Sequence, residues 1–211
     1  MSKKAFRTFP QKLIGDLYHV GTMDITKKSK FSHEGNGLSV SNCPDAWRRI
    51  TEGLTHGKTF MLRKRGMKLL DFYMLTAEEK AEIQRWAVSN GYVEEATLYK
   101  SITWNEFGEE FFSIYESYEE ALTEADNEEE RVQPVDGLLP TQKMKDTSMV
   151  HIELLQVRDF ITALYTEQVL NYDGIYWDEL LDEGVYSAPR GVIFNSKLPS
   201  FTVTCIDEDS E

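Results

Sequence analysis

Cysteine is scarce in this chain, and the patterns that indicate metal sites or disulfide frameworks are missing. Cys43 and Cys205 are the two cysteines among 211 residues, and neither belongs to a CxxC pair or a Cys/His cluster. The sequence therefore gives no indication of a bound metal. So few cysteines favour a reducing compartment such as the cytoplasm, although a single disulfide between the two residues stays open as an alternative.

Long apolar runs and the common catalytic signatures are also absent. No run approaches the roughly 20 apolar residues that a membrane-spanning helix needs, and the basic start MSKKAFRTFPQK lacks the apolar core of a signal peptide. The chain has no Gly-rich phosphate loop, no nucleophile elbow and no HExxH motif. We therefore expect a cytoplasmic protein without a membrane partner, in which any site combines residues far apart in the sequence.

Charge is distributed unevenly along the chain. Residues 1–68 contain 14 Lys and Arg against 5 Asp and Glu, a net charge of +9, whereas residues 69–211 contain 9 against 31, a net charge of −22. The cations of the basic third either belong to an ordinary solvated surface or share one face that attracts phosphate. These cations include Lys27, Lys28, Lys30, Arg48, Arg49, Arg63, Lys64 and Arg65.

The pattern of apolar and turn residues predicts an α+β fold in one domain, residues 1–211, with an acidic insertion near 105–148. Short strands are expected at 17–20, 38–41, 59–62, 67–74, 98–104, 110–115, 172–175, 190–194 and 201–206. Helices are expected at 44–53, 76–90, 117–130 and 149–169, and the second of these begins with a capping box, Thr76 to Glu79.

Two further expectations concern how these elements are connected. The strands at 59–62 and 67–74 are expected to form a hairpin that turns at Arg65 and Gly66, and those at 98–104 and 110–115 a second hairpin. Residues 132–148 contain two prolines and little periodicity, so we expect a loop or a lid there.

The acidic, aromatic segment between the expected strands 172–175 and 190–194 is the first candidate for a functional site, because binding groups concentrate in loops held by rigid strands. Arg190 could clamp a phosphate or carboxylate in a bidentate way, or form an ion pair within the loop. The loop carboxylates could supply a base or stabilise a cationic transition state, as glycosyl transfer demands. The segment contains Trp177, Asp178, Glu179, Asp182, Glu183 and Tyr186. Trp177 is interpreted either as a ligand platform or as a core residue.

Two shorter strands also carry polar candidates. His19 lies on the expected strand 17–20, just before Gly21 and Thr22, where backbone amides could approach a ligand. Ser39 and Ser41 share one face of their strand, because side chains alternate with a period of two. Each of these also has an ordinary interpretation, as a hydrogen-bonded strand histidine and as serines that face water.

Three separated blocks of the sequence occur in a characteristic order. They are LYHVGT at 17–22, GLSVS at 37–41 with an Ala-Trp pair at 46–47, and YDGI at 172–175 followed by RGVIF at 190–194. In this order the blocks resemble the ADP-ribosyltransferase superfamily, in the branch that uses a His–Tyr–Glu set. Residues 54–150 have no counterpart in this comparison. Similar sequences occur among phage and bacterial proteins.

The resemblance implies a split, mostly antiparallel β core with flanking helices, and NAD as the substrate. His19, Gly21 and Thr22 would hold the ribose and amide of NAD, and Ser39 and Ser41 would support the nicotinamide. ADP-ribose would pass to a protein or nucleic-acid acceptor, in the host cytoplasm if the protein is phage-encoded. The resemblance also predicts that the strand of His19 lies beside the strand 190–194.

The chain departs from the family pattern at three positions. Val20 separates the histidine from the glycine, Ser39 stands in place of the stacking tyrosine, and Arg190 stands in place of the catalytic glutamate. The resemblance then implies that Glu179, or another carboxylate of the same loop, substitutes for that glutamate. Two alternatives stay open: an inactive interaction protein of this fold, such as an acidic phage inhibitor of a host factor, and an RNA-directed phosphotransferase that uses basic residues on a phosphate.

Overall fold

The structure, a computed structural model, describes residues 8–24, 37–50, 57–104, 107–147, 152–180 and 188–207. It combines helices with mostly antiparallel strands, so the α+β class expected from the sequence is confirmed. The chain divides into two compact units, the first made of Met1–Glu82 and Ala163–Glu211 and the second of Ile83–Thr162. The acidic insertion expected near 105–148 lies within the second unit.

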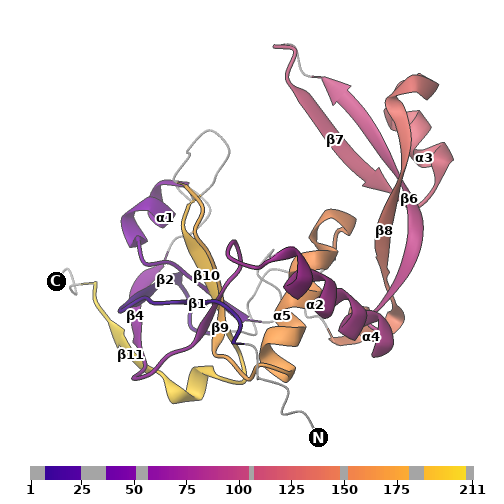
Figure 1. The fold of residues 1–211 in the computed structure, drawn as a ribbon. Coiled ribbons are helices and arrows are strands. Elements are labelled where there is room, and N and C mark those ends of the chain that lie inside the picture. Colours follow the sequence, from indigo (N-terminus) through magenta and orange to yellow (C-terminus); the bar gives the residue numbers. More distant parts are fainter. Residues whose placement is uncertain are drawn as a thin grey trace, which may run out of the picture. The chain divides into compact units, whose positions relative to one another are not determined.

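Two sheets form the centre of the first unit (Figure 1). The larger sheet has the strand order β1-β5-β9-β10-β3, and the smaller has the order β11-β4-β2. Among these strands β5 and β9 pair in parallel, whereas the other pairs are antiparallel. The strands are β1 (Gln11–Lys12), β2 (Leu17–Gly21), β3 (Gly37–Val40), β4 (Lys58–Arg63), β5 (Leu69–Asp71), β9 (Gly174–Trp177), β10 (Arg190–Phe194) and β11 (Thr202–Cys205).

The two sheets are joined by one bridge between β2 and the end of β3. Tyr18 and Ser41 exchange both backbone hydrogen bonds, with N···O distances of 2.8 and 2.9 Å. Because β3 pairs with β10, it lies between β2 and β10, and the strand of His19 is one strand away from strand 190–194 rather than its hydrogen-bonded neighbour. The two strands are separated by about two strand spacings, roughly 10 Å.

The core of the first unit lies under these sheets. Its buried residues are Leu17, Leu38, Val40, Leu62, Leu69, Tyr176, Ile193 and Phe201. Glycine permits the close approach of β9 and β10, since a Cβ on Gly174 would lie 1.9 Å from the carbonyl oxygen of Val192. A Cβ on Gly191 would lie 2.7 Å from the ring of Tyr176. These two glycines therefore set the packing at the centre of the larger sheet.

The hairpin expected from 59–62 and 67–74 is wrong, although both strands exist. β4 pairs with β2 and β11 in the smaller sheet, whereas β5 pairs with β1 and β9 in the larger one. The turn contains Gly66, with a φ of +70°. A turn of this kind is compatible with a hairpin and with a change of sheet, so the local signal did not separate the two.

The second unit is built around an antiparallel sheet in the order β7-β6-β8 (Figure 1). The expected hairpin is confirmed, since β6 (Val93–Trp104) pairs with β7 (Glu110–Tyr115) over residues 99–104. Helix α3 (Tyr118–Glu124) contributes Ala121 to a buried cluster with Val132. Helices α2 (Ala77–Ser89) and α5 (Val157–Gln168) run across the two boundaries between the units.

The loop expected at 132–148 is also wrong. Residues Val132–Pro140 form β8, which pairs with β6 over residues 93–101, and Gln142–Thr147 form helix α4. Proline cannot donate a backbone hydrogen bond, but an edge strand needs only half of its backbone groups for pairing. Pro134 and Pro140 are tolerated because β8 is an edge strand of the described sheet.

Helix α3 is shorter than predicted, whereas α2 and α1 start as expected. Helix α3 ends before 130, since Asp126 and Asn127 have φ values of 54° and 64°, in the left-handed region that ends a helix; a short 3₁₀ turn (η2, Glu129–Arg131) follows. Helix α2 has the expected capping box, in which Glu79 accepts from the Thr76 N–H at 2.8 Å. Helix α1 (Pro44–Ile50) starts at the expected proline, and residues 51–56 lie outside the described part.

The helix expected at 149–169 begins later, at Val157. Residues 148–151 lie outside the described part, and Leu154–Gln156 form a short 3₁₀ turn, η3. Glu153 before it is extended, with φ −82° and ψ 148°, so the helix cannot continue back through this residue. The buried face of α5 nevertheless follows the expected spacing of three and four residues, with Val157, Phe160 and Ile161.

We expect Ile161→Asp to lower the free energy of unfolding by several kcal/mol, because it introduces an unpaired carboxylate at a position that is 2 % exposed. Urea unfolding followed by circular dichroism measures the effect. Leu155→Asp is the matched control, since Leu155 is 54 % exposed, and its midpoint should stay close to that of the unchanged protein. Equal losses in the two variants would show that burial on α5 does not stabilise the fold.

Candidate functional site

The ends of β9 and β10 bring together three of the residues singled out in the sequence. Trp177 is the last residue of β9 and pairs with Arg190, the first residue of β10. Glu179 follows two residues after Trp177 and reaches the Arg190 guanidinium. Nη2 of Arg190 lies 3.1 Å from Oε1 of Glu179, and Nε lies 3.3 Å from both carboxylate oxygens. The ion-pair interpretation of Arg190 is thus realised, with Glu179 as a partner.

This ion pair lies beside two aromatic side chains, those of Trp177 and Phe72. The guanidinium of Arg190 is 5.0 Å from the centre of the Trp177 ring, a distance that allows cation–π attraction, and Phe72 packs 5.5 Å from the same ring. The side chains of Arg190 and Glu179 are each about one-fifth exposed, so their attraction is screened less than that of a surface pair. Trp177 itself is buried.

The indole N–H group of Trp177 is a hydrogen-bond donor without an acceptor in the described part of the structure. Its Nε1 is buried and has no acceptor among the described residues. A buried indole N–H normally finds an acceptor, so an orphan of this kind requires a specific explanation.

A second ion pair borders the first. Asp178 accepts from Nζ of Lys12 on β1 at 2.5 Å, and Tyr73 donates from its hydroxyl to Glu179 at 3.4 Å. Two ion pairs are therefore formed by the residues that follow β9. Asp182, Glu183 and Tyr186 of the same loop lie outside the described residues.

His19, in the middle of β2, lies within hydrogen-bond distance of two backbone carbonyls. Its Nδ1 lies 2.8 Å from the oxygen of Ser39, and its Nε2 lies 3.0 Å from the oxygen of Thr22. A carbonyl oxygen only accepts, so a neutral imidazole can satisfy one of these contacts and the imidazolium both. Gly21 has a φ of +136°, and a Cβ on it would lie 3.3 Å from Nε2. Glycine therefore permits the turn that brings the Thr22 carbonyl back onto the ring.

The two serines differ in what they contact. Ser41 is fully buried, and its hydroxyl donates to the Pro189 carbonyl at 2.5 Å and accepts from the Cys43 N–H at 3.0 Å. It thereby ties the start of α1 to the residue before Arg190. Ser39 is half-buried and contributes its carbonyl to His19. A continuous set of contacts thus runs from His19 through β3 to the start of β10.

Tyr176 is a central residue that the sequence analysis did not single out. It is fully buried on β9, and its hydroxyl donates to Oδ1 of Asn42 at 2.6 Å while accepting from the Asn42 N–H at 3.3 Å. Burial is the largest cause that raises the pKa of Tyr176, to about 12. The apolar run that contains it indicated a buried strand, but no signal in the run distinguished this tyrosine from its neighbours.

The free energy of unfolding should therefore fall at alkaline pH. The folded-state pKa of Tyr176 lies above the ordinary value of 10, so its contribution is complete below pH 10 and is lost as pH rises from 10 through about 12. In Tyr176→Phe this part of the fall, roughly 3 kcal/mol by the usual conversion of pKa into free energy, should be missing. Urea unfolding at a series of pH values measures it, and Tyr73→Phe, at an exposed tyrosine, should leave the fall unchanged.

Several cations that could have formed a phosphate-binding face are paired with carboxylates instead. Arg48 pairs with Asp207 at 2.8 Å, and Arg63 pairs with Asp16 at 2.7 Å. The hydrogen bond from Arg63 lowers the pKa of Asp16 below its ordinary value. Residues 27–30 and the Arg49 side chain lie outside the described part. The described cations thus favour the interpretation of a mixed-sign surface.

Comparison with known proteins identified no relative of this chain. No family model, curated protein sequence or solved structure matches the chain significantly. Within the described residues, no three His, Cys, Asp or Glu side chains are grouped as metal ligands. Among the same residues, no helix is long and apolar enough to cross a bilayer.

Proposed function

We propose that the protein transfers ADP-ribose from NAD to a protein or nucleic-acid acceptor. In this reaction the bond between the nicotinamide nitrogen and C1′ of the ribose breaks, and its electron pair leaves with nicotinamide. A nucleophile of the acceptor then forms a bond to C1′ and loses its proton to solvent. Positive charge develops on the ribose in the transition state, so the protein must supply negative charge at that point.

One observation carries the proposal, namely the contact between Glu179 and Arg190. The resemblance to ADP-ribosyltransferases requires a carboxylate at the start of the strand 190–194, where this chain has an arginine. The Glu179 carboxylate lies 3.1 Å from that arginine, so a carboxylate, paired with Arg190, stands at the start of β10 although it comes from the segment after β9. Arg190 would then act as a positioning residue that orients Glu179.

The arrangement of the three resembling blocks supports the same proposal. Blocks 37–41 and 190–194 form adjacent strands, and block 17–22 joins them through the bridge between Tyr18 and Ser41. His19 and Thr22 would hold the ribose and amide of NAD, and one carbonyl contact of the His19 ring would be exchanged for the ligand. Ser39 would lie under the nicotinamide, whereas Ser41 would support the start of β10 through Pro189.

The chemistry of the donor set fits a dinucleotide. Arg190 is a cation that can accompany a diphosphate, and Glu179 can accept from a ribose hydroxyl. Trp177 is 4 % exposed and packs against Phe72 and Arg190, so its ring would support the site and offers no open stacking surface.

Nicotinamide release from NAD by the purified full chain tests the proposal, with water as the acceptor if no other is present. We expect release above the spontaneous rate, and a loss of release in His19→Ala. A second candidate, an interaction protein of the same fold, is favoured by the Arg190–Glu179 pair, which engages both groups within the chain. Protein that neither binds nor cleaves NAD would contradict the enzymatic proposal and leave this second candidate.

A further inference from the structure

The outer edge of β7 pairs with no strand among the described residues, although η3 lies close to this strand. β7 pairs with β6 on one side, and its other side carries no strand among the described residues. Natural edge strands are usually protected by lysine, proline or a bulge, because unpaired backbone groups attract further strands. The sequence of β7, EFFSIY, contains neither lysine nor proline, and Phe111 and Phe112 are about half exposed. Such an edge is suited to pairing with another chain.

A cavity of about 570 Å³ opens beside the second half of this strand. Ile114 and Tyr115 of β7 line it together with Pro140 of β8 and with Ile152 and Leu154 near η3. In a strand added to an edge, alternate side chains point to the same face, and pockets beside the edge then provide specificity. The cavity is therefore placed to receive an apolar side chain of an added strand.

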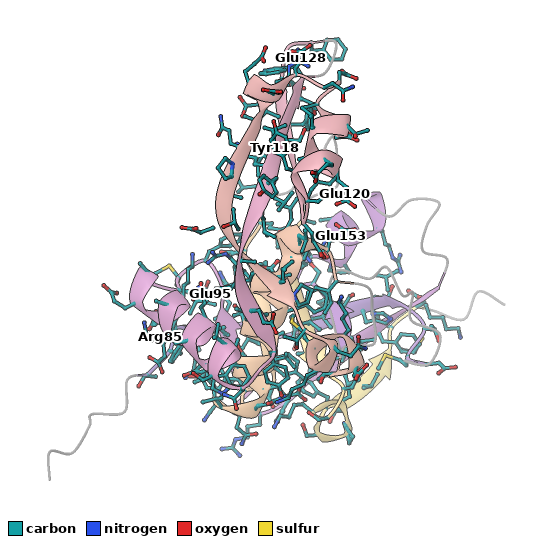
Figure 2. The ribbon with its side chains drawn as sticks, turned by 90° about the vertical axis from the view of Figure 1, so that its right-hand side faces the viewer. Arg85, Glu95, Tyr118, Glu120, Glu128 and Glu153 are labelled. Atoms are coloured by element: carbon teal, nitrogen blue, oxygen red, sulfur yellow. The ribbon has the colours of Figure 1, made fainter. Side chains whose placement is uncertain are left out.

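The charge around this edge defines the partner. The unit Ile83–Thr162 contains 17 Asp and Glu against 6 Lys and Arg, a net charge of −11, which leaves −2 for the rest of the chain. Figure 2 shows acidic side chains along the unit, among them Glu95, Glu120, Glu128 and Glu153. Glu110 lies at one end of β7, 3.9 Å from Lys100 of β6, and Glu116 and Glu153 line the cavity at the other end together with Lys145. This field attracts a cationic segment and repels nucleic acid.

We propose that the edge of β7 and the neighbouring cavity dock an extended segment of a partner protein in which Lys or Arg alternates with apolar residues. The segment adds to the sheet β7-β6-β8 as a further strand. Its backbone pairs with β7, its apolar side chains contact Ile114 and the cavity, and its cations meet the carboxylates around the edge. The site lies within the second unit and does not depend on NAD chemistry.

Three synthetic peptides of ten residues test the proposal on the full chain, by fluorescence anisotropy without NAD. One alternates Lys and Val, the second alternates Lys and Gly with the same charge, and the third alternates Glu and Val. We expect the Lys/Val peptide to bind at least tenfold more tightly than the Lys/Gly peptide, because glycine weakens strands, and the Glu/Val peptide not to bind. Equal affinities for the two cationic peptides would show attraction by charge alone and overturn strand addition.

A matched pair of variants locates the site. Ile114→Lys places a charge on the edge and should weaken binding of the Lys/Val peptide at least tenfold. Phe107→Lys adds the same charge at an 80 % exposed position before β7 and should change binding by no more than about twofold. Hydrogen exchange on the unchanged protein decides the matter even if Ile114→Lys fails to fold. The bound Lys/Val peptide should slow exchange of alternate amides within 110–115, and unchanged exchange there would refute the proposal.

Discussion

Glu179→Gln is expected to lower nicotinamide release from NAD by about 100-fold or more, the size of effect found when one charge-stabilising group is removed from an active site. The substitution keeps the size of the side chain and removes its charge. In the proposed reaction this charge faces the cationic ribose, so the loss should appear in kcat more than in KM. The melting temperature should fall by only a few degrees, because one partly exposed ion pair is lost.

Asp178→Asn is the matched control for this experiment. It removes the same charge from the neighbouring residue, whose side chain is 52 % exposed and pairs with Lys12. We expect nicotinamide release in this variant to stay within about twofold of the unchanged protein, because an exposed charge is largely screened. Equal losses in the two variants would indicate a general effect of loop charge and would remove the special role of Glu179.

Asp173→Ala is expected to lower the free energy of unfolding by about 3–5 kcal/mol, the range seen when one partner of a buried ion pair is removed. The Asp173 carboxylate accepts from Nζ of Lys64 at 2.6 Å and from the Lys68 N–H at 2.9 Å. Its side chain is 8 % exposed and that of Lys64 is 25 % exposed. Removal leaves a partly buried ammonium group and a backbone donor without this acceptor.

Asp178→Ala provides the comparison, since Asp178 also pairs with a lysine at a similar distance, 2.5 Å from Lys12. The two pairs differ mainly in the exposure of the carboxylate. We expect the exposed pair to contribute about 0–1 kcal/mol. Urea unfolding of both variants separates burial from pairing as the source of stability, and similar losses would contradict this explanation.

The local elements of the fold could be predicted from the sequence because each has a local cause. The spacing of Val157 and Ile161 indicated a helix face, and the capping box at Thr76 marked a helix start. Pairing between strands has no such local cause. The segments that form β4 and β5 lie five residues apart across a turn, yet they belong to different sheets, because β5 pairs with β9 more than a hundred residues later.

The strand β8 shows a second reason why the sequence alone could not predict every element of the fold. Its two prolines argue against a central strand, and the sequence analysis therefore predicted a loop at 132–148. Proline is compatible with an edge strand, but which strand lies at an edge depends on the whole sheet. Only the order β7-β6-β8 explains why Pro134 is accommodated there.

The sequence could predict which segment of the chain holds the candidate site, but it could not predict which side chains of that segment contact each other. The sequence left open whether Arg190 clamps a ligand or pairs with a carboxylate of the preceding loop, and several carboxylates were equally suitable. The choice depends on the register of β9 and β10, which pairs Trp177 with Arg190 and so brings Glu179 within reach. The burial of Tyr176 depends on the same register, because it lies opposite Gly191 and requires the space that the glycine leaves.

The most direct test of the NAD site is a titration of the isotope-labelled full chain with NAD, followed by backbone amide chemical shifts. The account predicts that the largest shifts fall at residues 19–22, 39–41 and 177–179 and at Arg190, four segments that come together only in the folded first unit. Shifts of this pattern without nicotinamide release would indicate an NAD-binding protein that has lost catalysis. An unchanged spectrum at millimolar NAD, or shifts confined to residues 83–162, would contradict the proposed site.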